Sequence, residues 1–141
     1  MKMDLSTKGM EQLTDMLLRL ASADFAPAVT EALNLAGKEA VDRLREAADK
    51  HHGGGTGGMR DSITASDPKI NENGGYISIT LKGTKAKGWR YRDQGGELNY
   101  GSGRRRASHW FDDGQEKAQP EVERILTETI EAWIESAETV A

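Results

Sequence analysis

Apolar residues recur at helical spacing at both ends of the chain. Near the start, positions spaced i, i+3 and i+4 form one stripe, which predicts a short N-terminal helix. The stripe consists of Met10, Leu13, Met16, Leu17 and Leu20. A long second helix is expected over about 25–52, because apolar and alanine residues hold one face through this range. Asp24 suits its N-cap, and Pro27 is tolerated in its first turn.

The last part of the chain carries a third apolar stripe. Its members are Val122, Ile125, Leu126, Ile130, Trp133, Ile134 and Ala137. Pro120 fits either the first turn of this helix or a kink that follows a short turn over 110–118. We expect the stripe, with Trp133 as its largest member, to be buried against the long helix or a sheet.

Between the helices, alternation of apolar and polar residues predicts strands. Residues 76–82 alternate strongly, residues 59–65 alternate weakly, and residues 89–92 form a third strand with a charged outer face. Turn residues at 73–75 precede the strong strand. The expected fold is α+β: the long helix and the C-terminal helix pack on a small antiparallel β-sheet, preceded by the short N-terminal helix. One domain spans residues 1–141.

Glycine composition adds two loops to this outline. Fourteen of the 16 glycines lie between Gly53 and Gly114. Residues 53–58 and 95–108 are expected to be flexible loops. The second range has a single large aliphatic residue, Leu98, and no usable period. Ordering its backbone would cost on the order of 14–28 kcal/mol, with almost no apolar burial to offset that cost.

Charge is distributed unevenly along the chain. The net charge is -4 at pH 7, but residues 53–110 carry ten basic and five acidic side chains. Residues 111–141 carry two basic and nine acidic side chains. A basic middle therefore precedes a strongly acidic end, and each can meet a surface of the opposite sign.

Residues that could carry catalysis or bind a metal are sparse. The absence of cysteine excludes disulfides and thiolate metal sites. The glycines of 53–58 are followed by Met59 and Arg60, not by the Lys and Ser/Thr of a phosphate-binding loop. The histidines lack strong metal-ligand spacing, both in the pair His51-His52 and in the set His109, Asp112 and Asp113. We expect no catalytic residue, no metal and no cofactor.

Membrane and export signals are also lacking. The first eight residues do not contain the apolar stretch of a signal peptide, and no apolar run is long enough to cross a membrane. The expectation is a protein that is made in the cytoplasm and has no membrane partner.

The basic middle contains the candidate interface. Residues 82–106 carry eight basic and two acidic side chains. The expected interface residues are Arg90, Arg92, Tyr100, Arg104, Arg105, Arg106 and Trp110. One interpretation is a small nucleic-acid-binding module, because aromatic and basic residues alternate in single-stranded nucleic-acid grooves. The other is contact with an acidic protein surface, which the overall pI near 5.4 favours.

Four motifs, in order, resemble the tail-completion or head–tail joining proteins of long-tailed phages and prophages. They are Lys8-Gly9-Met10-Glu11-Gln12-Leu13; Thr56-Gly57-Gly58-Met59-Arg60-Asp61-Ser62-Ile63; Tyr91-Arg92-Asp93-Gln94-Gly95-Gly96; and Ser108-His109-Trp110-Phe111-Asp112-Asp113-Gly114. The positions that match the family pattern are Thr56, Gly57, Arg60, Ser62, Ile63, Gly95 and Phe111. Trp110 stands where the family has a proline, and the glycine turn lacks the usual threonine.

The resemblance implies an α+β fold and a structural part in the virion, without catalysis. It implies that the protein completes the tail or joins it to the head, as a homo-oligomeric ring in the neck region. The implied partners are connector or head-completion proteins and tail-tube or tail-terminator proteins, with only incidental DNA contact. Synthesis in the cytoplasm of a bacterial host is implied as well. A ring whose subunits contact head to tail pairs two different surfaces of each copy, which suits the uneven charge.

Overall fold

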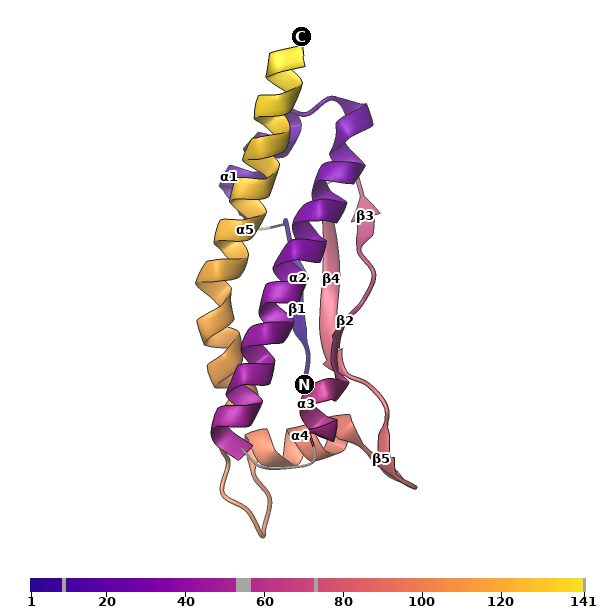
Figure 1. Cartoon of the computed structure of the whole chain (residues 1–141), viewed down its shortest axis with the longest axis vertical. Coiled ribbons are helices and arrows are strands. Elements are labelled where there is room, and N and C mark those ends of the chain that lie inside the picture. Colours follow the sequence, from indigo (N-terminus) through magenta and orange to yellow (C-terminus); the bar gives the residue numbers. More distant parts are fainter. Residues whose placement is uncertain (9, 53–56, 73, 141) are drawn as a thin grey trace.

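Two long helices run side by side along the molecule. A computed structural model describes residues 1–8, 10–52, 57–72 and 74–140. Helix α2 (Ser22–His52) and helix α5 (Trp110–Val140) make the most extensive contact between elements, and the short α1 (Glu11–Leu18) lies against α5 (Figure 1). The alanine-rich face of α2 allows this close approach. At Gly114 of α5, an added Cβ would lie 3.0 Å from the Cβ of Ala47.

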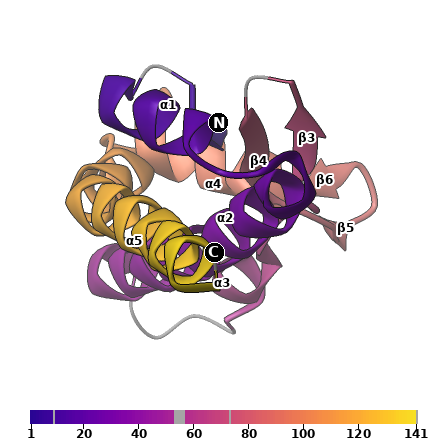
Figure 2. The same ribbon diagram turned by 90° about the horizontal axis from the view of Figure 1, so that it is seen from above.

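A small antiparallel sheet packs on another side of α2 (Figure 2). Its central strand β4 (Gly74–Leu81) pairs with β1 (Met3–Ser6) along one edge. Along the other edge it pairs first with β3 (Lys69–Asn71) and then with β2 (Ile63–Ala65). Pro68, which cannot donate to a ladder, lies between β2 and β3 and explains the interruption.

The sheet turns one apolar face toward α2. Its buried side chains are Met3, Leu5, Ile63, Ile77, Ile79 and Leu81. Gly37 of α2 lies directly against the Cδ1 atom of Ile77, where an added Cβ would collide. The helix backbone at Gly37 therefore packs directly on a side chain of the sheet, which explains a glycine in the middle of a 31-residue helix.

Several short elements lie near the end of the molecule where α2 ends. They are α3 (Gly58–Ser62), the two-stranded sheet of β5 (Thr84–Ala86) and β6 (Trp89–Arg90), and α4 (Tyr91–Tyr100). Helix α4 lies across the end of the molecule where α2 ends and α5 begins (Figure 1).

The α+β class, the long helix, the C-terminal helix and the strong central strand are confirmed. Three local predictions are wrong. Residues 58–62 are helical, so the weak strand reduces to β2. Trp89 and Arg90 pair with β5 and not with β4, and the chain turns helical at Tyr91. Residues 110–118 are not a separate turn, because Pro120 lies inside a continuous α5. The confirmed long helix begins at Ser22.

Two further predictions are corrected by burial. The predicted loop over 95–108 is wrong for 95–100, which are the second half of α4; Leu98 and Asn99 are buried there and help to offset the ordering cost. Residues 101–108 do form a loop. The stripe of the last helix packs on the interior, but Trp133 is only half-buried at its edge. Of the other expected loop, residues 53–56 lie outside the described residues.

Candidate interaction site

Eight exposed basic residues gather at one end of the molecule. They are Lys82, Lys85, Lys87, Arg90, Arg92, Arg104, Arg105 and Arg106. The first four precede α4 on or beside the β5–β6 ribbon, and Arg92 lies in the first turn of α4. The last three lie in the loop between α4 and α5, which projects beyond the ends of the long helices (Figure 1). We call residues 101–106 the arginine loop.

Helix α4 is fixed at its start by Arg90 and Asp93. The backbone N–H and the guanidinium of Arg90 both donate to the Asp93 carboxylate, at 3.1 Å, as a capping box. These hydrogen bonds raise the pKa of Arg90 and lower the pKa of Asp93. The positive charge of Arg90 is therefore already neutralised within its own helix and contributes little to an external partner.

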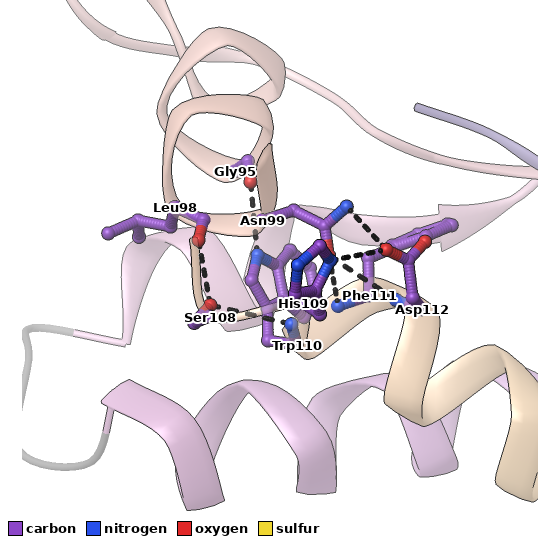
Figure 3. A network of polar contacts seen from close by, with 8 residues as sticks. All are labelled: Gly95, Leu98, Asn99, Ser108, His109, Trp110, Phe111 and Asp112. Atoms are coloured by element: carbon purple, nitrogen blue, oxygen red, sulfur yellow. Dashed lines mark hydrogen bonds and ion pairs between the residues drawn. The ribbon is translucent and has the colours of Figure 1, made fainter. Parts of the chain in front are cut away.

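Helix α4 is anchored to α5 by Trp110. The Trp110 side chain is 0% exposed and packs edge-on against Phe111, with 5.5 Å between ring centroids. Its indole Nε1 donates to the carbonyl oxygen of Gly95 at 3.0 Å (Figure 3). The absence of a side chain at Gly95 allows this approach, since an added Cβ would lie 3.3 Å from Cζ2 of Trp110 and 2.7 Å from Cδ2 of Leu81.

Asn99 closes the base of the arginine loop (Figure 3). Its buried Oδ1 accepts hydrogen bonds from the backbone N–H groups of Phe111 and Asp112, at 2.9 and 3.3 Å, and so caps the start of α5. Its own carbonyl accepts from the N–H of His109 at 3.0 Å, and the carbonyl of Leu98 accepts from the N–H of Ser108 at 2.9 Å. The two ends of the loop are therefore held together.

Within the arginine loop the backbone forms a tight turn. Ser102 and Arg105 exchange backbone hydrogen bonds at 3.0 and 3.3 Å, and the Ser102 hydroxyl donates to Glu97 of α4 at 3.1 Å. Gly101, with φ +84°, starts the turn. Arg104, Arg105 and Arg106 are exposed, and among the described residues no carboxylate lies within ion-pairing distance of their guanidinium groups.

The structure keeps six of the seven expected interface residues at the surface. Arg90, Arg92, Tyr100 and the three arginines of the loop are exposed, Tyr100 at 61%. Trp110 as an interface residue is wrong, because its ring belongs to the core and its only polar atom is used by Gly95. No local pattern indicates that Gly95, 15 positions away, is the partner of Trp110.

The positions of the phage-family pattern that the structure describes have structural roles. Gly57 adopts φ +80° at the start of α3, and Arg60 pairs with Asp49 of α2 at 3.4 Å. Ser62 is buried and its hydroxyl donates to the Met59 carbonyl, while Ile63 and Phe111 are core residues and Gly95 makes the contact above. Thr56 lies outside the described residues.

His51 and His109 each lie within hydrogen-bonding distance of one carboxylate. His51 Nε2 lies 3.1 Å from Asp113 Oδ2, and His109 Nδ1 lies 3.0 Å from Asp112 Oδ2. The hydrogen bond from His51, with that from Lys117, lowers the pKa of Asp113. Among residues 1–8, 10–52, 57–72 and 74–140, no three His, Asp or Glu side chains come close enough to share a metal ion. No helix in these ranges is both long and apolar enough for a bilayer span.

A groove between α2 and α5 lies toward the opposite end, and sequence reasoning missed it. It encloses about 510 Å³ and is lined by Glu31, Leu35, Glu128, Thr129, Ala132, Trp133 and Ser136. Leu35 is 46% exposed, and the Trp133 indole donates a hydrogen bond to Glu31. Leu35 is an apolar residue outside the buried stripe of α2, and this position was the one sequence feature that could have indicated the groove.

No family model, curated protein or solved structure matches the chain.

Proposed function

We propose that the chain is a structural protein of a long-tailed phage or prophage, which completes the tail or joins it to the head as part of a ring. The observation that carries this proposal is the charge polarity of the folded chain. Three arginines, which have no carboxylate partner among the described residues, project at one end. At the other end, α5 beyond Ile125 carries four exposed glutamates and no Lys or Arg. The order of motifs that resembles the tail-completion family supports the same function.

Such polarity suits a subunit whose two ends contact different surfaces. Subunits in a cyclic head-to-tail assembly each present one surface to the preceding copy and a different one to the following copy. The same surfaces also suit neighbours of opposite charge, namely connector or head-completion proteins on one side and tail-tube or tail-terminator proteins on the other. The proposed location is the neck or tail of the virion, after synthesis in the host cytoplasm.

Gene deletion tests this function. Removing the reading frame from the phage or prophage that encodes it should leave filled heads and tails unjoined in electron micrographs, with a sharp fall in infectious particles. A plasmid copy should restore joining, and the protein should then be found in purified particles by mass spectrometry. Normal particles after deletion would show that the proposed function is wrong.

A matched pair of variants tests whether the arginine loop is required for joining. Replacing Arg104, Arg105 and Arg106 together by alanine should leave the melting temperature nearly unchanged, because these side chains are exposed and unpaired, and should abolish complementation. Replacing Lys82, Lys85 and Lys87 by alanine removes the same charge from the neighbouring ribbon and should still complement.

A nucleic-acid-binding module is the second candidate, favoured by two exposed aromatics. Trp89 is 37% exposed and is followed by Arg90, and Tyr100 is 61% exposed and precedes the arginine loop. Single-strand binding surfaces combine aromatic and basic residues in this way. Purified protein would then bind single-stranded DNA tightly, with an affinity that falls steeply as salt rises. Weak binding without base stacking at Trp89, seen as unchanged Trp89 fluorescence, would exclude this role.

A further inference from the structure

We propose that the arginine loop of one copy binds the groove between α2 and α5 of the next copy. This inference rests on the proposed ring function and names the two surfaces that would meet. The groove offers an indole ring, an aliphatic side chain and carboxylates: Trp133, Leu35, Glu31 and Glu128. The arginine loop offers three guanidinium groups and the neighbouring exposed Tyr100.

The chemistry of the groove matches guanidinium in particular. The groove walls contain two carboxylates and no basic side chain. A guanidinium plane can stack on the indole face of Trp133 while its N–H groups donate to a carboxylate, an arrangement that Arg makes better than Lys. Glu31 already accepts from the Trp133 indole, so a carboxylate is held beside the ring.

The groove continues along α2 with the same sign of charge. A second hollow of about 480 Å³ shares Leu35, Glu128 and Thr129 with the first. It adds Glu39, Asp42 and Ile125, with Lys38 as its one basic residue. Arg124 and Arg43 pair with Glu128 and Glu39 from outside the groove and reduce, without reversing, its negative charge.

The loop and the groove of one copy cannot meet. The groove residues of α5 begin at Glu128, 18 positions beyond Trp110, the first residue of α5 after the loop. This separation corresponds to roughly 27 Å along the helix at about 1.5 Å per residue. The loop also projects away from the groove, beyond the ends of the long helices (Figure 1). The loop that binds the groove must therefore belong to another copy, and the contact is head to tail.

Engineered cysteines test the contact directly, because the chain has none of its own. The pair R105C and A132C should give a ladder of covalent oligomers on non-reducing gels, since a disulfide needs Cα atoms within about 7 Å. R105C with K2C, on the exposed face of the sheet, is the matched control and should give no ladder. The absence of a ladder with A132C under oxidising conditions overturns the proposal.

A charge exchange provides the second test. R104E/R105E/R106E reverses the charge of the loop, and E31K/E128K reverses the charge of the groove. Each variant alone should self-associate with an affinity lower by roughly tenfold or more, measured by sedimentation velocity. Mixing the two should restore association, because an acidic loop then meets a basic groove and the wild-type loop meets the wild-type groove. K82E/K85E/K87E has the same charge change as the loop variant and should associate like the wild type, and circular dichroism should show all variants folded.

The results separate this inference from the proposed function. A wild-type chain that stays monomeric at every concentration and low salt, or variants that associate as well as the wild type, would overturn the loop-in-groove contact. The deletion experiment would still report on joining of heads and tails. A mixture that fails to associate while each single variant is folded overturns the contact as well.

Discussion

The indole Nε1 of Trp110 donates a hydrogen bond to the carbonyl oxygen of Gly95, 3.0 Å away, and joins α5 to α4. The W110A variant should therefore unfold at lower urea, with a loss of about 3–5 kcal/mol for truncation of a buried aromatic. W110F keeps most of the packing but leaves the Gly95 carbonyl without its donor, which should cost about 1–3 kcal/mol. W89A, at an exposed tryptophan, is the control and should change stability by about 0.5 kcal/mol or less. Equal losses for W110A and W89A would mean that Trp110 is not in the core.

The adjacent glycines of α4 should respond with opposite sign to the same substitution. G95A places a Cβ 2.7 Å from Leu81 and 2.9 Å from Met1, which should cost about 1–3 kcal/mol. G96A meets nothing within 4 Å and should stabilise by about 0.5–1 kcal/mol, because alanine favours the helix. Urea unfolding of the two variants measures the difference directly. A stabilising G95A would contradict the close contact between α4 and β4.

The fold should depend on both the acceptor oxygen and the donor nitrogen of the buried Asn99 amide for its stability. N99A removes the acceptor of the Phe111 and Asp112 N–H groups and should cost about 1–3 kcal/mol. N99D keeps an acceptor but replaces the Nδ2 donor, 3.2 Å from the Asp112 carboxylate, by a second carboxylate. N99D should therefore be destabilised at pH 7 and regain stability as the pH falls below about 5. A pH-independent defect would contradict the repulsion.

Asp113 should contribute to acid sensitivity. Its pKa lies below the ordinary 3.8, because His51 and then Lys117 donate to its carboxylate. A carboxylate whose pKa is lower in the folded chain stabilises the fold above the unfolded pKa, and this contribution is lost as the pH falls through the folded value. D113N should thus be less stable than the wild type at pH 7 and should lose less stability between about pH 4 and pH 2. E116Q, at an exposed neighbour, is the control; parallel acid profiles for D113N and the wild type would contradict the effect.

The long helices and the central strand were predictable because their hydrophobic patterns extend over many residues. The stripe of α5 and the strong alternation of β4 each persist over enough residues to outweigh local exceptions such as Pro120. β1 was missed although Met3 and Leu5 alternate with Asp4 and Ser6, because four residues are too short to be distinguished from chance.

The interior of the candidate site was not predictable from local pattern. Two glycines in α4 each cost about 1 kcal/mol in a helix, so residues 95–100 favour a loop until Gly95 is recognised as a contact surface. Asn99 has the composition of a loop residue, yet it is buried because its amide caps another helix. The partners of Gly95 and Asn99 lie 15 and 12 positions away in the sequence, and local periodicity does not indicate such contacts.

Because the base of the arginine loop is closed by hydrogen bonds, the loop can change in sequence and length independently of the rest of the fold. The bonds at Leu98–Ser108 and Asn99–His109 hold the stem, so residues 102–106 can diverge, lengthen or be exchanged without moving α4 or α5. An insertion after Gly103 enlarges a loop whose ends are already joined, and each doubling of loop length costs only about 0.6 kcal/mol of closure entropy. The sequence of the loop can therefore change, or be replaced by a foreign peptide, independently of the stability of the scaffold.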